Sequence, residues 1–271
     1  MGLTIHAKLS TGARCDAGRA RAIVRSLHRA AERFANTGRV DAVGPVLDDV
    51  SAIRHAIRSI CIERESKRLD GSMIQLRDTL PALAGWGFGI EVGAGCEQLW
   101  LGLCRYHAGT VVAGRQWIET GLGRGWHFSL FCKTQYASVH GAAHFLRCHR
   151  AVIDLLLFAR RHGVRVRIND EGRYWPRRNE AALLRHCHFL DTAIAGAAGA
   201  FKDLAGDTGA RMQAPIFSHP QFEHLEAEGV ARVGPHLARM TNAVRTKKIP
   251  VAKSADYPTQ ALKFDYDFHN E

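Results

Sequence analysis

The sequence predicts an α+β protein with a ferredoxin-like split βαβ core, in which an antiparallel sheet carries helices on one face. Apolar residues recur at strand spacing and helix spacing in the order strand, helix, strands, helix, strand, with no internal repeat. The 271 residues, of which 46% are hydrophobic, suffice for a sizeable core. We expect a single α+β domain over residues 1–205, ending in an added C-terminal helix. Residues 206–271 are expected to form an extension that is partly extended or disordered.

In the N-terminal half, residues 3–9 alternate sufficiently between apolar and polar side chains to predict the first strand. A helix is expected from Asp16 to about Phe34, because an Asp side chain can accept hydrogen bonds from the free amides at a helix start. Residues 40–50 have the pattern of a strand and turn, and isoleucines at helical spacing predict a second helix over residues 50–65. The glycine-rich stretch over residues 77–125 is typical of strands joined by tight turns.

In the C-terminal half, residues 126–136 alternate as a strand, and apolar residues at helical spacing predict a long helix over residues 139–162. Residues 164–168 form a further strand, with valine and isoleucine on one side and two arginines on the other. A last long helix is expected over residues 179–204, with Asn179 at its start.

The composition indicates a cytoplasmic protein with no membrane partner. No apolar run approaches the roughly 18 residues that span a bilayer. The first residues lack the basic segment and the apolar run of a signal peptide. The seven cysteines are odd in number, widely spaced and without a CxxC pair, which favours reduced thiols over a disulfide framework.

The net charge of +11 is concentrated in two parts of the chain and favours an anionic partner, such as a nucleotide or nucleic acid. Residues 1–70 hold 13 Lys/Arg against 8 Asp/Glu, and residues 126–176 hold 8 against 3. In the first predicted helix, arginines recur every four residues and form a basic ridge, which consists of Arg21, Arg25, Arg29 and Arg33. The ridge is either a solvated helix face or a surface that contacts phosphates.

The end of the strand over residues 126–136 carries the first candidate site. Alternation places Lys133 and Gln135 on one face, where an ammonium group and an amide suit a phosphate, a carboxylate or a base edge. Tyr136 follows, and its hydroxyl could orient a ligand or relay a proton. The alternative is a polar strand end on the surface.

The helix over residues 139–162 contributes His149, whose neighbours at helical spacing are apolar. His149 is either a core residue with satisfied hydrogen bonds or a buried neutral imidazole that acts as a general base. On the far side of this helix, Arg150 and Asp154 are expected to form an i,i+4 ion pair.

Residues His140, His144 and Cys148 recur every four positions and invite a comparison with helical zinc sites. No Glu follows His140, and the three side chains drift off a single helix face. We therefore predict no metal site, and the sequence indicates no particular cofactor.

The strand over residues 164–168 ends at the second candidate site. Asp170 and Glu171 precede a glycine there and are placed for acid/base chemistry, whereas Arg173 and Trp175 offer a charge and a stacking surface for a base or sugar ring. The alternative is an Asx-type turn followed by aromatic packing.

Several segments of the chain have a specific character, namely GLTIH (2–6), GCE (95–97), GLCRY (102–106), FCKTQYAS (131–138), FLRCH (145–149), DEGRYW (170–175) and FEHLEAEG (222–229). Together they resemble a set of bacterial proteins with no established activity. The resemblance spans most of the chain and implies a bacterial, cytosolic protein with one integrated fold, but it implies no mechanism. Residues 139–144 and the extra length over about 107–125 depart from that set, and the first departure further weakens a metal site.

The leading hypothesis is an enzyme that acts on a phosphate-bearing ligand, such as a nucleotide or nucleic acid. Lys133, Gln135 and Arg173 would bind the anion, and Asp170 or Glu171 would be the acid/base or hold a divalent ion. The alternative is a non-catalytic module that binds nucleic acid through the basic ridge and the basic tail, or that binds another protein. The sequence decides neither whether the protein is an enzyme nor its oligomeric state.

Overall fold

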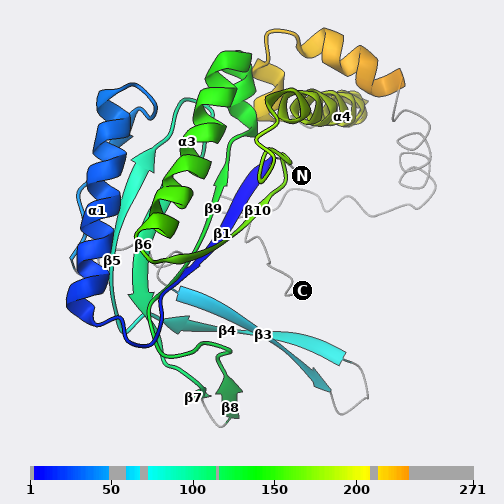
Figure 1. Ribbon diagram of the computed structural model, residues 1–271. Helices are drawn as coiled ribbons and strands as arrows, with labels where there is room; N and C mark the ends of the chain where they lie inside the picture. The colour runs from blue at the N-terminus through cyan, green and yellow to red at the C-terminus, as the bar shows by residue number, and fades with distance from the viewer. Residues whose placement is uncertain (1–2, 49–58, 68–72, 114–115, 208–212, 232–271) are drawn as a thin grey trace.

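The computed structural model describes residues 3–48, 59–67, 73–113, 116–207 and 213–231 (Figure 1). The largest feature is an antiparallel sheet with the strand order β10-β1-β9-β6-β5-β2. Its strands are β1 (Thr4–Ser10), β2 (Ala42–Val43), β5 (Ala84–Glu91), β6 (Leu99–Arg105), β9 (His127–Lys133) and β10 (Arg165–Asp170).

Two interleaved split βαβ units define the core of the sheet. In the first, the chain runs from β1 through helix α1 (Ala17–Asn36) and then through β2, two strands outside this sheet and β5 to β6, and β9 lies between β1 and β6. In the second, helix α3 (Ala142–Arg161) connects β9 to β10, and β1 lies between those strands. The predicted α+β class and the ferredoxin-like core are therefore confirmed, with β5 and β2 added at one edge of the sheet.

The alternation of β1, β9 and β10 separates a buried face of this part of the sheet from an exposed face. Ile5 and Leu9 of β1 and Phe128 of β9 are buried on the first face, against Leu27 of α1 and Leu156 of α3. Helices α1 and α3 lie next to each other on that face (Figure 1). The side chains at the intervening strand positions point away from both helices.

The starts of α1 and α4 (Glu180–Asp207) follow from their capping residues. The side chain of Asp16 accepts a hydrogen bond from the Arg19 amide at 2.7 Å, as predicted. Asn179 accepts one from the Ala182 amide at 2.9 Å, and α4 begins there. No helix within the described ranges is both long and apolar enough to cross a bilayer.

Two hairpins lie outside the main sheet, formed by β3 (Ser59–Lys67) with β4 (Met73–Pro81) and by β7 (Thr110–Ala113) with β8 (Gln116–Glu119). The helix predicted over residues 50–65 is wrong from Ser59 onward, because those residues pair with β4 along its whole length. The remaining part of that prediction, before Ser59, lies outside the described residues. Isoleucine spacing suited a helix locally, but a partner strand decided the outcome.

The part of the predicted extension that the structure describes contains the short helix η2 (Pro215–Ser218) and a helix over residues 222–231. The latter crosses α4 closely at a pair of glycines. A Cβ atom at Gly229 would lie 2.2 Å from the Thr192 carbonyl oxygen and 2.8 Å from the Gly196 amide nitrogen. A small apolar cluster that includes Ala195 and Leu225 accompanies this crossing.

Candidate functional site

The two predicted candidate sites meet at the N-terminal end of β1. Because β1 lies between β9 and β10, Thr4 pairs with Lys133 on one side while Ile5 pairs with Asp170 on the other. The two strand ends are therefore neighbours, although the residues between them include all of α3.

Lys133 and Gln135 do not share a face, so that prediction was wrong. Strand β9 ends at Lys133, and the short helix η1 (Gln135–His140) turns the chain out of strand geometry. The Gln135 side chain is buried, where its oxygen accepts a hydrogen bond from the Leu3 amide at 3.1 Å. Its Nε2 donates to Asp191 of α4 at 2.9 Å. Gln135 thus ties β1, η1 and α4 together.

A buried chain of polar groups runs from η1 through α3 to the end of β10. The Thr134 hydroxyl and His149 Nδ1 are 2.9 Å apart, and His149 Nε2 lies 3.1 Å from Asp170 Oδ1. The side chains of His149 and Asp170 are both fully buried. The burial of His149 agrees with its predicted place on the apolar face of α3.

Asp170 is held by the backbone as well as by His149. Its two carboxylate oxygens accept hydrogen bonds from the Gly172 and Trp175 amides, each at 2.8 Å. Burial by itself would raise the pKa of Asp170, but the hydrogen bond and charge of His149, together with the two amides, outweigh it and lower the pKa. Asp170 is therefore ionised in the folded protein at neutral pH. The turn after β10 has the Asx-type form that was the alternative to a catalytic role.

The other predicted residues lie closer to solvent. Glu171 is 43% exposed, accepts a hydrogen bond from the Thr4 amide at 2.9 Å and lies 3.3 Å from His6 Nε2. The Lys133 ammonium group lies 4.8 Å from the centroid of the Tyr136 ring. Arg173 is exposed.

Trp175 is half-buried, with the Arg160 guanidinium 5.4 Å from the centroid of its ring. Arg160 also donates hydrogen bonds to the Val166 carbonyl at 2.8 and 3.2 Å. The indole and the guanidinium therefore brace β10 against the end of α3, and the stacking surface predicted for a ligand is shared with this arginine.

The exposed face of the sheet is a functional feature that the sequence reasoning missed. Antiparallel register places the outward-pointing side chains of β10, β1 and β9 in three rows. These rows are Asn169–His6–Phe131, Arg167–Lys8–Ser129 and Arg165–Ser10–His127. The Phe131 side chain is 42% exposed on the central strand β9. Aromatic, imidazole, basic and hydrogen-bonding groups therefore share one open surface, which we call the sheet face.

The charge of the sheet face is positive. Lys8, Arg165 and Arg167 are exposed, and the structure gives neither arginine an ion pair with a described residue. Two acidic side chains among the described residues contact one end of this part of the sheet, where Glu171 binds the Thr4 amide and Glu97 binds the Lys133 amide. The alternation of β10 is visible in the sequence and predicts that Arg165 and Arg167 lie on one side of that strand. The residues of β1 and β9 that lie beside them follow only from the register of the sheet.

Three cysteines lie together at the end of the sheet near α3, and the described residues contain no cluster of His, Cys, Asp or Glu that could hold a metal ion. The Cys148 pKa is lowered, chiefly by a hydrogen bond from Cys96, which outweighs burial, with a further contribution from Arg147. Burial raises the pKa of Cys132, and its thiol donates to the Glu97 carbonyl at 3.3 Å. The lowered Cys148 pKa thus depends chiefly on a thiol neighbour.

Comparison of the chain with protein-family models, curated proteins and solved structures finds no match. The segments FCKTQYAS and FLRCH fall on β9 with η1 and on α3. They supply Thr134, Gln135 and His149, three of the buried polar residues of the site. Both segments therefore have a structural role in this fold.

Proposed function

We propose that this protein binds single-stranded nucleic acid on the sheet face. The observation that carries the proposal is the row arrangement in which Phe131 lies among Lys8, Arg165 and Arg167, on the face of the sheet opposite to α1 and α3. A sheet face that combines exposed aromatic rings with cations suits single strands, because bases stack on the rings while cations contact the phosphates.

The dimensions of the sheet face suit an extended strand. Neighbouring β-strands are about 4.8 Å apart, and side chains two positions apart on one strand are separated by about 7 Å. A base stacked on Phe131 would therefore have His6 and Asn169 within reach on the adjacent strands, where Asn169 can both donate and accept hydrogen bonds. Lys8 and Arg167 occupy the next row, where they can contact the phosphates on either side of that base.

The burial of Asp170 and His149, two of the predicted acid/base residues, favours binding over the enzyme hypothesis. Asp170 and His149 are fully enclosed and hold each other, so a substrate would have to displace packed structure to reach them. Lys133 and Glu171 remain accessible at one end of the sheet face, where they can contribute to binding.

The proposal is tested by removing equal charge from the two layers of the molecule. The triple variant K8A/R165A/R167A removes three cations from the sheet face, and R25A/R29A/R33A removes three from exposed positions on α1, which packs on the other face. Binding of a fluorescent single-stranded RNA or DNA oligonucleotide is measured by anisotropy at several salt concentrations. Each lost phosphate contact lowers the slope of log affinity against log salt by about 0.7.

We expect the sheet-face variant to lose a slope of about 2, which corresponds to roughly a hundredfold in affinity near 0.1 M salt. The α1 variant should bind much as the parent does. Equal losses in the two variants would point to non-specific attraction, and a loss confined to R25A/R29A/R33A would move the interface to the basic ridge. Either result, or a parent protein that binds no oligonucleotide, contradicts the proposal.

The aromatic contribution is separable from the charge. Phe131→Ala removes an exposed ring without changing the charge, so it should weaken binding by about 1–3 kcal/mol and leave the salt slope unchanged. Leu83→Ala is a matched control, because Leu83 is a similarly exposed apolar side chain, 48% accessible, outside the three rows. If both substitutions have the same effect on affinity, Phe131 does not stack on a base.

A further inference from the structure

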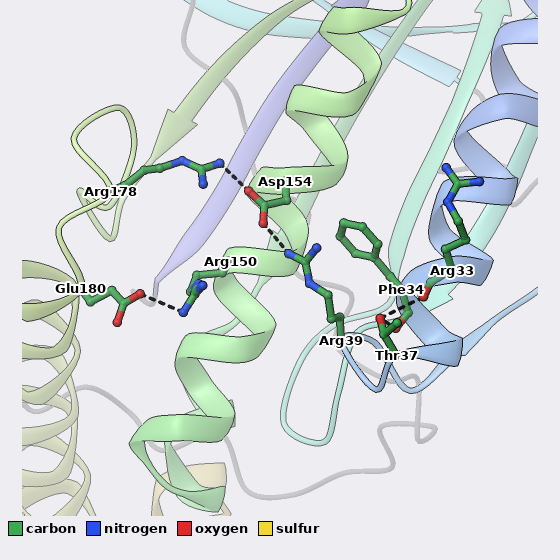
Figure 2. A network of polar contacts seen from close by, with 8 residues as sticks. All are labelled: Arg33, Phe34, Thr37, Arg39, Arg150, Asp154, Arg178 and Glu180. Atoms are coloured by element: carbon green, nitrogen blue, oxygen red, sulfur yellow. Dashed lines mark hydrogen bonds and ion pairs between the residues drawn. The ribbon is translucent and has the colours of Figure 1, made fainter.

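A second basic site lies in the helical layer, between α3 and the segment after α1. It is a pocket of about 400 Å³ lined by Arg39, Arg147, Arg150 and Asp154. Figure 2 shows Arg39 reaching Asp154 from the segment after α1 and Arg178 reaching it from the segment before α4, while Arg150 lies on α3 and points toward Glu180. Arg147, Arg150 and Asp154 belong to α3, which covers the buried face of the sheet, and Arg39 follows α1, so this pocket is separate from the sheet face.

Each arginine of the pocket is held in a defined position. The Arg39 guanidinium lies 3.7 Å from the centroid of the Phe34 ring and pairs with one oxygen of Asp154. Arg147 donates to the Gly38 carbonyl at 3.1 Å and to Asp41 at 3.0 Å. These contacts fix the side chains before a ligand arrives, which reduces the entropy lost on binding.

The charge of Asp154 is neutralised by two arginines. Its other oxygen pairs with Arg178, so both carboxylate oxygens are occupied by guanidinium groups. Arg150 pairs with Glu180 at 2.9 Å and is 47% exposed, whereas Arg147 is 27% exposed. A guanidinium has five N–H donors, and these ion pairs use only some of them.

The charge of the lining indicates the class of ligand. Three arginines and one aspartate line the pocket. Together with the groups that pair with them, which are Arg178, Asp41 and Glu180, they carry four positive and three negative charges, so the network has a net charge of +1. A phosphate monoester carries a charge of about −1.5 to −2 at neutral pH, and its three free oxygens match the planar fork of arginine. A phosphodiester has only two free oxygens and therefore offers fewer acceptors to the guanidinium groups. The volume is within the range of about 300–1,000 Å³ that is typical of small-molecule sites.

We infer that this pocket binds a phosphate monoester, with Arg147 and Arg150 contacting the phosphate while Asp154 holds the Arg39 guanidinium beside it. The monoester belongs either to a small phosphorylated molecule or to the 5′ end of a nucleic-acid strand. This inference does not depend on the sheet face.

The test is calorimetric titration of the full chain with inorganic phosphate, a nucleoside 5′-monophosphate and the unphosphorylated nucleoside. We expect both phosphates to bind and the nucleoside not to bind. Arg150→Gln should weaken binding of the monophosphate by at least about tenfold, whereas Arg25→Gln, at an exposed position on α1, should not change it. If neither phosphate binds, or if Arg150→Gln binds as the parent does, the inference is refuted.

A second variant, Asp154→Asn, is expected to bind phosphate more tightly than the parent. A purely structural ion network would not give this increase in affinity. Asp154→Asn removes the negative charge from the lining, so inorganic phosphate should bind more tightly, although the folded protein should be less stable because two arginines lose their partner. Circular dichroism at the titration temperature confirms that the variant is folded. Phosphate binding that is weakened in folded Asp154→Asn contradicts the inference.

Two further measurements identify the source of the phosphate and separate this site from the sheet face. If the ligand is a strand end, a 5′-phosphorylated oligonucleotide binds more tightly than its 5′-hydroxyl form, and Arg150→Gln abolishes the difference. If the ligand is a small molecule, the two oligonucleotides bind equally while the monophosphate still binds. The variant K8A/R165A/R167A should retain monophosphate binding, so failure of the proposed function would leave this result intact.

Discussion

Substitution of Asp170 by Asn tests whether the buried chain Thr134–His149–Asp170 stabilises the fold. The substitution keeps the size of the side chain but removes the charge and replaces one oxygen by an NH₂ group. In the native structure one oxygen receives the Gly172 amide and faces His149 Nε2, and the other receives the Trp175 amide. The Asn side chain has a single oxygen, so it cannot serve both sets of donors.

The expected loss follows from these contacts. If the Asn oxygen keeps the side of Gly172 and His149, then the Trp175 amide meets a donor and is left unsatisfied, which costs about 1–3 kcal/mol. The interaction with His149 also changes from one with a charged acceptor to one with a neutral acceptor, and a hydrogen bond to a charged group contributes about 1.5–3 kcal/mol. We expect a reduction of about 3–5 kcal/mol in the free energy of unfolding, which is also typical when a buried ion pair loses one partner.

The pH dependence of the unfolding free energy provides a second test, because its direction is predicted independently of its size. The pKa of Asp170 in the folded protein is lowered below its ordinary value of about 3.9, so the unfolded chain takes up the proton first as the pH falls. The stability that ionised Asp170 contributes is therefore complete above about pH 4 and is lost as the pH falls through the lowered pKa. The difference in unfolding free energy between the parent and Asp170→Asn should be constant at neutral pH and shrink in that acid range.

The assay is urea denaturation followed by circular dichroism, from about pH 7 down to about pH 3. Glu171→Gln is the matched control, because the neighbouring carboxylate is 43% exposed and should contribute less than about 1 kcal/mol. The reasoning is refuted if the two variants lose the same free energy, or if the deficit of Asp170→Asn grows as the pH falls.

Two further predictions concern the turn and the thiols beside α3. Gly95→Ala should lower the melting temperature by at least twice as much as Gly109→Ala. Both glycines have positive φ, but only at Gly95 would a Cβ atom meet backbone, 2.3 Å from the Tyr136 carbonyl oxygen; equal losses by calorimetry would mean that the neighbouring backbone yields. Cys96→Ala should raise the pKa of Cys148, because the hydrogen bond from Cys96 is the main cause that lowers it. Titration of the thiolate ultraviolet absorbance measures this shift, and an unchanged profile would contradict the assignment.

Local patterns were sufficient to predict the order of the core elements. The strand and helix periodicities, together with the Asp16 cap, led to the ferredoxin-like topology that the structure has. The position of His149 on the apolar side of its helix also follows from spacing alone. Each of these features depends on residues within a few turns of one another.

The ion pair predicted between Arg150 and Asp154 was wrong, because arginines far away in the sequence compete with the one on the same helix. Asp154 was expected to pair with Arg150, but it binds Arg39, which is 115 positions away, and Arg178 after β10. A helical i,i+4 pair contributes only about 0.2–0.5 kcal/mol, so better-placed guanidinium groups readily replace it. Arg150 consequently pairs with Glu180 at the start of α4.

The candidate site was found in part because polar strand ends are visible in the sequence. Their burial was not, because it depends on α3 and α4 covering the same end of the sheet. The rows of the sheet face require the register of β1 against both β9 and β10. A shift of one residue in either pairing would turn the basic side chains toward the helices, and composition does not encode that choice.

The central position of β1 has a consequence for how the chain is made. Leu3 and Thr4 bind Gln135 and Glu171, which lie 132 and 167 positions later. During synthesis, β1 and α1 leave the ribosome long before β9 and β10 are made, so neither edge of β1 can pair with its neighbouring strand during that time. The fold is therefore expected to close late and slowly, with the nascent N-terminal half dependent on chaperones until the strand at residues 165–170 emerges.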